Sequence, residues 1–404
     1  MSIDEEGPVF EDAMWRRARS RNLEPRAKMR RIVGEAKHTP FRFTQSLLLR
    51  HTLILGATGS GKTNHAFVAI KQASRLSAFK TCLVIDVKRE YRRLEKMTRE
   101  EVQVLAVGDE PRVSFNPLIP PPGMEPDLWD VAFADVFLRA YGLSEPSRRI
   151  LLDCLWALRQ GSKASPTLRE LESAVGDFRT ESSKEQASRR SLESRLHIIN
   201  MGAVGRSLNS ELPLDFARME GRVTVFEIGR INSLRDQRFL AELMLAQLWH
   251  YDTTRPIKGD EAPDEKLRRL IVVEEAHRYL SEERPPTQRG DRTLLELAIA
   301  EARRYGWGFI IVDQMPTLLS RYVWDNCGTI FAHRLTNLDS YEVVKSALGG
   351  KIIGRDDDMD NDPAALRLPE NVALFRRYVE PNSILSGGVG IVTVPRAEDP
   401  EPVE

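Results

Sequence analysis

A glycine-rich segment near the start of the chain, residues 53–63 with the sequence LILGATGSGKT, constrains the fold more than any other feature. An apolar strand is predicted at 51–55 and an amphipathic helix at 64–77, on either side of the turn. The glycines let the backbone turn tightly, so that successive N–H groups and the positive end of the helix converge on one point. The spacing G-x(4)-G-K-T in this context predicts a site for a nucleoside triphosphate rather than an ordinary glycine turn.

The residues expected to contact this nucleotide, taken as ATP, form the loop and the first turn of the helix. They are Gly56, Ala57, Thr58, Gly59, Ser60, Gly61, Lys62, Thr63 and Asn64. Lys62 is expected to place a positive charge on the β- and γ-phosphates, and the Thr63 hydroxyl is expected to hold Mg²⁺.

Composition places few further limits on function. With 404 residues, 41% hydrophobic and 29% charged, the chain has the composition of a globular protein of two or three domains. It contains no run of about 18 apolar residues and no apolar signal core, which predicts a cytoplasmic protein without a membrane partner. Cys82, Cys154 and Cys327 are odd in number and lack metal-binding spacing, so reduced thiols are expected.

The formal net charge is zero, so any binding to nucleic acid must depend on local patches. Residues 15–45 contain ten Lys or Arg against Glu24 and Glu35. This segment is either a solvated basic helix or a contact to DNA or to an acidic neighbouring subunit. The aspartates at 356–362 are expected to lie in a disordered loop, and residues 398–404 form an acidic tail.

Strand and helix patterns alternate along most of the chain, which predicts an α/β fold with a mostly parallel sheet covered on both faces. Further strands are predicted at 81–86, 222–228, 270–273, 308–312 and 329–334, and helices at 234–251, 293–304 and 338–348. Residues 116–220 differ: prolines lead into helical periodicity at 128–141, 146–160, 167–178 and 188–200. We expect a helical insertion placed on the sheet, between core segments 41–115 and 221–349. A basic extension (1–40) precedes the core, and a C-terminal strap with an acidic tail (350–404) follows it.

Two adjacent carboxylates, Glu274 and Glu275, end the strand predicted at 270–273. Such a strand can deliver one carboxylate to the water shell of Mg²⁺ and the next to the attacking water. We therefore assign Glu274 to the metal and Glu275 to water activation. The pair favours hydrolysis over phosphate transfer to a small molecule.

Three further residues are candidates for the reaction. Gln314 follows the next strand and either contacts the γ-phosphate or the attacking water, or merely closes a loop. Arg303 and Arg304 end the preceding helix. One of them either reaches the phosphates of an adjacent subunit as an arginine finger or simply complements the helix dipole.

These motifs, taken together and in order, resemble the HerA/FtsK superfamily, and HerA-type ATPases most of all. The resemblance extends over residues 52–349 and rests on the segments GATGSGKT (56–63), VIDVK (84–88), FNPL (115–118), VEEAH (273–277), YG (305–306) with VDQMP (312–316), and Asn326 with HRL (333–335). It implies a RecA-like P-loop ATPase domain with a helical insertion, a hexameric ring with nucleotide between subunits, and ATP-driven movement of double-stranded DNA. By position, Lys62 and Thr63 belong to Walker A, Glu274 and Glu275 to Walker B, Gln314 is the sensor, and Arg303 or Arg304 is the trans finger.

Two departures from the family pattern matter. Glu274 stands where the superfamily often has Asp, and its longer side chain still suits an outer-sphere Mg²⁺ contact. Only about 50 residues precede the glycine-rich loop, which leaves no room for the β-barrel that archaeal HerA-like proteins carry there. Ring assembly must then depend on the ATPase core, the basic extension and a C-terminal strap at 368–395 with a last strand at 389–394.

The interpretation we favour is a ring ATPase that translocates on or unwinds DNA beside a nuclease or another effector, in repair or anti-phage defence. The alternatives are a conjugation- or secretion-type motor and a nucleotide-gated ring scaffold that activates an effector. DNA tracking needs Lys or Arg on loops that face the pore. The candidates for these contacts are Arg230, Arg235, Arg284, Arg289 and Arg292.

Overall fold

The computed structural model of the chain describes residues 41–76, 79–97, 101–110, 112–161, 165–254, 266–281, 293–348, 368–377 and 389–397. The predictions for the basic extension at 1–40 and for the acidic residues at 356–362 and 398–404 lie outside these residues.

One sheet runs through the described part of the chain, with nine strands in the order β3-β4-β2-β5-β6-β1-β7-β8-β9. The strands are β1 (Thr52–Leu55), β2 (Thr81–Asp86), β3 (Val102–Ala106), β4 (Arg222–Glu227), β5 (Arg269–Glu274), β6 (Trp307–Asp313), β7 (Thr329–Ala332), β8 (Val372–Arg377) and β9 (Val389–Thr393). From β3 to β7 every pairing is parallel, whereas β8 and β9 are antiparallel. The predicted α/β class with a mostly parallel sheet is confirmed.

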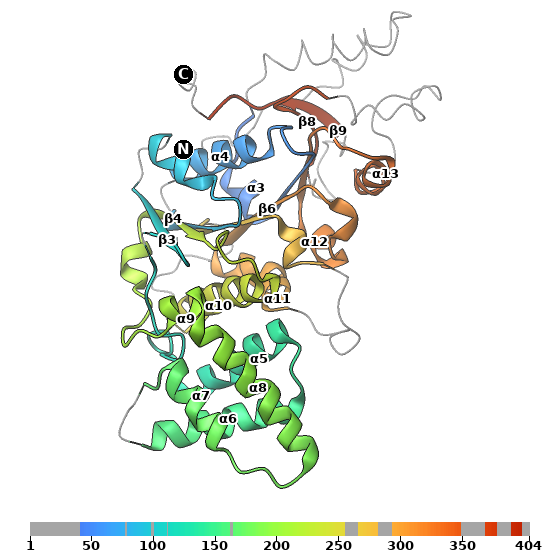
Figure 1. The fold of residues 1–404 in the computed structure, drawn as a ribbon. Coiled ribbons are helices and arrows are strands. Elements are labelled where there is room, and N and C mark those ends of the chain that lie inside the picture. Colours follow the sequence, from blue (N-terminus) through green and yellow to red (C-terminus); the bar gives the residue numbers. More distant parts are fainter. Residues whose placement is uncertain are drawn as a thin grey trace, which may run out of the picture.

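The central strands are buried along their whole length because helices cover both faces of the sheet. Successive residues point to opposite faces, so Leu53 and Leu55 belong to one apolar core and Ile54 to the other. Figure 1 shows α3 and α4 above the sheet and α10, α11 and α12 below it. The helices of these layers are α3 (Gln45–Leu49), α4 (Lys62–Ala73), α10 (Leu234–Thr253), α11 (Leu294–Glu301), α12 (Arg321–Asn326) and α13 (Leu338–Ala347).

The helical segment between β3 and β4 extends away from the sheet, as both ribbon views show. Its helices are α5 (Pro126–Tyr141), α6 (Glu145–Gln160), α7 (Leu168–Asp177), α8 (Ser183–Met201) and α9 (Ala203–Leu208). We call residues 126–208 the helical unit. It packs on α10 through α5, with Phe239 of α10 edge-on to Phe133 and Phe137.

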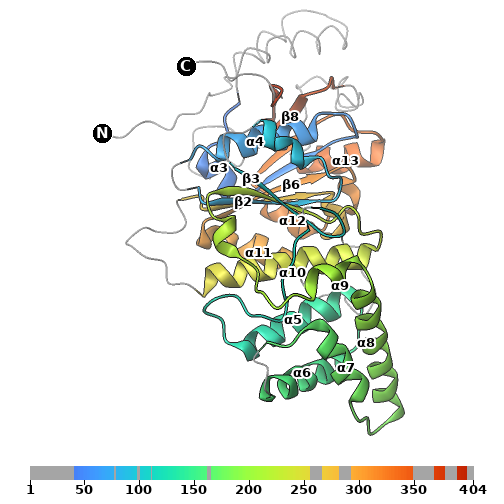
Figure 2. The ribbon, with the colours of Figure 1, turned by 60° about the vertical axis from the view of Figure 1, so that its left-hand side comes forward.

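The sequence predicts this unit on the sheet itself, but in the structure α10 lies between the two (Figure 2). The reason is visible in α10, which is buried almost all round from Phe239 to Leu248. A helix that is apolar on every side needs neighbours on every side, here the sheet and α5.

Among the described helices, none combines the length and the apolar character needed to cross a lipid bilayer.

Candidate nucleotide-binding and hydrolysis site

The glycine-rich loop leaves β1 between two neighbouring strands that fix its start. Gly56 donates its N–H to Asp313 O at the end of β6 (3.1 Å), and Ala57 donates to Arg334 O beyond β7 (2.7 Å). On β1 the last residue pairs with Asp313 on one side and Ala332 on the other. The loop therefore begins at the carboxyl edge of the parallel sheet, where open α/β sheets bind their ligands.

Two buried histidines support the loop from behind. His65 Nδ1 and His333 Nε2 lie 2.9 Å apart. Burial lowers the pKa of His333 to about 3, with Lys62 adding to the effect, and burial together with His333 lowers the pKa of His65 well below its usual value. Both rings are thus neutral at physiological pH. A Cβ at Gly56 would lie 2.7 Å from His333 Cβ, so this close approach requires glycine.

Lys62 begins α4 and curls back over the loop. Its Nζ donates to Ala57 O at 2.8 Å, and its side chain is buried, with the residue 4% exposed. Burial and the nearby Lys88 lower the pKa of Lys62, against the opposing charges of Glu274 and Glu275. A lysine held at the rim of the loop's N–H groups is placed to meet a phosphate.

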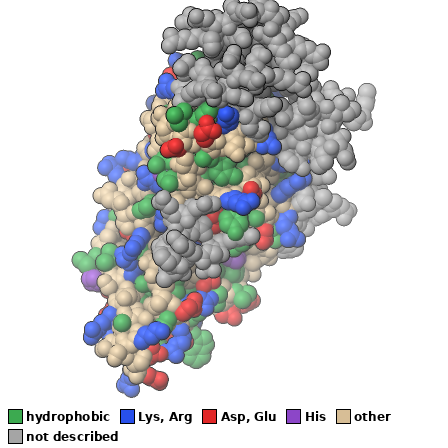
Figure 3. Space-filling view, turned by 90° about the vertical axis from the view of Figure 1, so that its right-hand side faces the viewer, with side chains coloured by type: hydrophobic (Ala, Val, Ile, Leu, Met, Phe, Trp, Pro, Cys, Tyr) green, Lys and Arg blue, Asp and Glu red, His purple; other side chains and the backbone are tan. Residues whose placement is uncertain are grey.

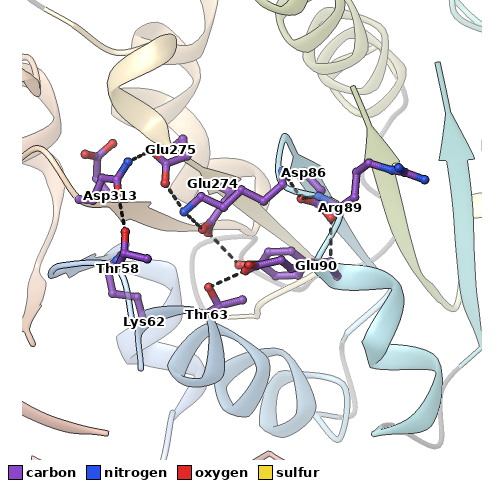
Figure 4. Close-up of polar contacts among 12 residues, drawn as sticks. Thr58, Lys62, Thr63, Asp86, Arg89, Glu90, Glu274, Glu275 and Asp313 are labelled. Carbon is purple, nitrogen blue, oxygen red and sulfur yellow. Dashed lines mark hydrogen bonds and ion pairs between the residues drawn. The ribbon is translucent and has the colours of Figure 1, made fainter. Parts of the chain in front are cut away.

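The end of β2 forms the second wall of the site. Asp86 is fully buried, and its carboxylate accepts the N–H groups of Lys88 (2.9 Å), Arg89 (2.7 Å) and Tyr91 (3.0 Å). The turn that this builds carries Glu90, which accepts a hydrogen bond from Thr63 Oγ1 at 3.1 Å. Figure 4 shows Thr63 and Glu90 facing each other between α4 and this turn.

Glu274 is the last residue of β5, Glu275 follows it beside this wall, and both are buried. Glu274 Oε2 accepts the Tyr91 hydroxyl at 3.1 Å, and Glu274 Oε1 lies 3.3 Å from Lys88 Nζ. Burial raises the pKa of Glu274 to about 7; Lys88 opposes this effect and Glu275 adds to it. A divalent cation next to this carboxyl would favour its ionised form.

The backbone of Glu275 adopts the left-handed conformation, with φ 52° and ψ 49°. For a residue other than glycine this conformation costs about 1–3 kcal/mol and is typical of functional sites. Gln314 Nε2 donates to Glu275 Oε2 at 2.8 Å, and Thr58 Oγ1 donates to Gln314 Oε1 at 3.0 Å. Gln314 therefore links the glycine-rich loop directly to Glu275.

Asp313, also fully buried, fixes the loops that carry these two residues. Its carboxylate accepts the N–H groups of His277 and Met315, both at 2.5 Å, and one of its oxygens lies 3.0 Å from His277 Nδ1. Because Met315 follows Gln314 and His277 follows Glu275 by two residues, one carboxylate sets the spacing between Gln314 and Glu275.

The residues present fit a nucleotide with its magnesium ion. The loop supplies backbone donors and a lysine, while Thr63 and the buried Glu274 supply the hydroxyl and the carboxylate that such an ion uses. Two adjacent residues connect Thr63 with Glu274. Glu90 accepts a hydrogen bond from the Thr63 hydroxyl, and the hydroxyl of the next residue, Tyr91, donates one to Glu274.

The last two strands complete the rim of the loop. We call β8 and β9, with residues 368–371 and 394–397, the C-terminal strand pair. Asn371 donates its N–H to Ser60 O at 3.1 Å, and Asn64 donates to Asn371 Oδ1 at 3.2 Å and accepts the Ala397 N–H at 2.8 Å. A Cβ at Gly61, whose φ is 101°, would lie 2.4 Å from Asn371 Oδ1. The strand pair thus packs against the loop so closely that only glycine fits there.

Comparisons with known proteins agree with this geometry. Residues 33–248, more than half of the chain, match the family described as the central domain of the helicase HerA. The chain belongs to this family. The matched range includes the glycine-rich loop, the β2 turn and the helical unit, and it ends before Glu274.

Solved structures show the same P-loop ATPase fold. VirB4 of Thermoanaerobacter pseudethanolicus superposes with a TM-score of 0.61 at 16% identity, over 85% of this chain and 89% of that one. The bacterial conjugative coupling protein TrwB superposes with a TM-score of 0.64 at 12% identity, over 92% and 93% of the two chains. A TrwB structure that holds ADP and Mg²⁺ gives 0.62 at 11% identity over 91% of each chain. No functionally curated protein matches the sequence significantly.

In this HerA-family chain, Arg303 and Arg304 do not lie near the glycine-rich loop. They are exposed in the 3-10 turn η6 (Ala302–Tyr305), which leads into the amino end of β6. The loop starts at the carboxyl edge. β6 has seven residues, and at about 3.3 Å per residue it separates the two edges by about 20 Å. Within one chain these arginines therefore cannot reach a phosphate group placed at the glycine-rich loop.

The candidate DNA contacts are only partly described. Arg230, beyond β4, has a 58% exposed side chain that pairs with Asp109 at 3.3 Å. Arg235 is exposed in the first turn of α10. Arg284, Arg289 and Arg292 lie outside the described residues. Among the described residues visible in Figure 3, Lys and Arg side chains are interspersed with acidic and apolar ones and form no extended basic patch.

Sequence reasoning missed several residues that shape the site. Lys88, Glu90 and Tyr91 form a polar run after β2, and polar residues at the carboxyl end of such a strand face the ligand crevice, but this signal names no partner for any of them. Asp313 had the same signal, a polar residue at a strand end. For Asn371 no local pattern existed, because its contacts depend on the packing of two strands far along the chain.

Proposed function

We propose that this protein is an ATP-hydrolysing motor that assembles as a ring of six subunits and moves double-stranded DNA. The observation that carries the hydrolytic part is the connection Thr58–Gln314–Glu275, which joins the loop that would hold the γ-phosphate to a buried carboxylate. A sensor amide between these two elements can transmit the presence or loss of the phosphate to the base. Family membership supports the same proposal.

The roles of the site residues follow from their positions. Lys62 and the loop N–H groups would bind the β- and γ-phosphates, and Thr63 and Glu274 would hold Mg²⁺, directly or through its water shell. Mg²⁺, when bound, neutralises charge on the phosphates. Glu275 would take the proton of the attacking water. Gln314 would orient that water and the carboxylate at the same time.

The ring is supported by the position of Arg303 and Arg304 at the edge of the sheet opposite the loop. An arginine there has no role at its own nucleotide, but in a head-to-tail ring it can contact the nucleotide of the next subunit. The DNA contacts proposed for Arg230, Arg235, Arg284, Arg289 and Arg292 would then lie on loops that face the pore.

For the domain organisation we propose a RecA-like core formed by 41–115 and 221–349, interrupted by the helical segment 116–220 and followed by a C-terminal strap at 350–404. A nuclease or another effector would work beside the ring, in repair or defence in the cytoplasm.

The function is tested by measuring ATP hydrolysis with duplex DNA over a salt series. We expect DNA to stimulate turnover at low salt. If the ring neutralises six or more phosphates, affinity for DNA should fall by about three orders of magnitude or more between about 50 and 200 mM salt. Equal turnover with and without DNA at low salt would contradict the motor proposal. Negative-stain imaging with ATP and duplex DNA would test the ring and the occupied pore.

A conjugation-type motor is the second candidate, because conjugative TrwB shares the fold. A ring scaffold that assembles an effector is the third. For the scaffold, slow turnover independent of DNA is expected, together with effector activity that appears only when the ring forms.

For the trans finger, we expect alanine at one of the two arginines, Arg303 or Arg304, to reduce turnover by about a thousandfold and to leave nucleotide affinity unchanged. Turnover should return when this variant is mixed with Lys62→Ala subunits. The Lys62→Ala subunits supply the arginine, and the arginine variant supplies an intact glycine-rich loop. Phosphate release from the mixture, compared with each variant alone, measures the rescue.

Arg321→Ala is a matched control for these arginines, since Arg321 is an exposed arginine of α12 paired with Asp325. It should hydrolyse ATP like the parent protein. Loss of turnover that no mixture restores would indicate a structural role for the arginine and would contradict the trans finger.

A further inference from the structure

Lys88 forms ion pairs with both glutamates of the site, and the proposed reaction gives it no role. It is the second residue after β2, and its side chain is 30% exposed, whereas those of Glu274 and Glu275 are 0% and 1% exposed. Its ammonium group lies 3.3 Å from Glu274 Oε1 and forms an ion pair with Glu275 Oε1. One cation therefore contacts both Walker B carboxylates.

The backbone of Lys88 is fixed independently of these ion pairs. Asp86 accepts the N–H groups of Lys88 and Arg89, and Arg89 itself is left-handed at φ 63°. Because a buried carboxylate holds this turn, the fold fixes the position of the Lys88 backbone, from which the side chain extends. The ammonium group approaches the glutamates from the β2 side of the site.

Glu275 is thereby held at both of its oxygens. Gln314 donates to Oε2 at 2.8 Å from the loop after β6, and Lys88 pairs with Oε1 from the turn after β2. Two contacts from opposite neighbours define the rotation of the carboxylate, which one contact alone would leave free. A general base must lie within hydrogen-bond distance of the attacking water, so the rate of hydrolysis depends on how its carboxylate is oriented.

We propose that Lys88 is a positioning residue for hydrolysis, which orients the carboxylate of Glu275 and couples it to Glu274. The inference rests on the proposed ATPase function. Lys88 does not need to touch the nucleotide; it acts through the two glutamates. Without it, no lysine or arginine among the described residues would contact these two buried carboxylates, and Glu275 would keep contacts at Oε2 alone, from Gln314 at 2.8 Å and from His277 Nδ1 at 3.7 Å.

The test compares Lys88→Met with Lys88→Arg and Lys88→Gln. Misplacement of a catalytic group costs about 100-fold in rate, so Lys88→Met and Lys88→Gln should lose kcat by about that factor, with KM for ATP nearly unchanged. Lys88→Arg can still bridge two carboxylates and should recover most of the loss. Titration with a fluorescent, non-hydrolysable ATP analogue and Mg²⁺ should show nearly the same affinity for all variants.

Lys96→Met is the matched control, because Lys96 is an exposed lysine in the 3-10 turn η1 (Tyr91–Lys96) that follows. It should retain parental kcat. If Lys88→Met and Lys88→Gln bind the analogue and keep parental kcat, the positioning role is wrong while the ATPase proposal stands. If the parent protein itself hydrolyses no ATP, the ATPase proposal fails. Equal loss of kcat in Lys88→Arg would show that charge at this position is not what matters and would also overturn the inference.

Discussion

Glu275→Gln should abolish ATP turnover while nucleotide binding persists. General-base catalysis contributes about 10²–10⁴-fold, and a carboxamide cannot accept the proton of the attacking water. The amide oxygen can still accept the hydrogen bond from Gln314, and the left-handed backbone at this position is kept, so the substitution removes the charge more than the shape. Phosphate release at saturating ATP measures turnover, and titration with an ATP analogue measures binding.

Glu301→Gln serves as the comparison for this substitution, because Glu301 is an exposed glutamate at the end of α11. Its turnover should equal that of the parent protein. If Glu275→Gln hydrolysed ATP at the parental rate, Glu275 would not be the base. Loss of binding as well as turnover would instead indicate that the carboxylate holds the loop in place.

Lys62→Ala should weaken nucleotide binding itself. Lys62 Nζ is buried at the loop, where a hydrogen bond to a charged group contributes about 1.5–3 kcal/mol. At about 1.4 kcal/mol per factor of ten, this predicts a Kd raised by about 10- to 150-fold. The loss has a second source, since the Ala57 carbonyl also loses the partner that it has at 2.8 Å. Equilibrium titration with the same ATP analogue gives the shift in Kd directly.

Lys80→Ala removes an exposed lysine at the entry to β2 and should leave Kd unchanged. An unchanged Kd in Lys62→Ala would contradict the assignment of the glycine-rich loop as the phosphate site.

The parts of the fold that local patterns determine could be predicted from the sequence. Strand β2 was expected at residues 81–86 and is found at Thr81–Asp86, because a short apolar run that contains β-branched residues favours a strand buried on both faces. Helix α7 was expected at 167–178 and spans Leu168–Asp177, and Thr167 forms a capping box with Glu170. The grouping of the glycine-rich loop with Glu274, Glu275 and Gln314 follows from their places just at or beyond the carboxyl ends of parallel strands.

Features that depend on long-range packing could not be predicted in this way. Helix α10 lies between the sheet and the helical unit because its buried surface packs against both. The hydrophobic periodicity of its sequence predicts a buried helix but does not identify these neighbours. The ion pairs of Lys88 are set by the order of strands in the sheet, since β2 lies beside β5 only after the chain has folded. The contact between Gly61 and Asn371 has no signal in either local sequence.

The contacts of the C-terminal strand pair also bear on how the subunit is made in the cell. The Asn64 side chain forms hydrogen bonds with the backbone of Pro395 and Ala397, which are 331 and 333 residues further along the chain. The phosphate loop therefore leaves the ribosome long before the segment that braces it has been translated. All the nucleotide motifs are therefore translated before the strand pair that contacts the glycine-rich loop, and a proteolytic cut just before residue 368 would break the chain between the motifs and this strand pair without altering any motif.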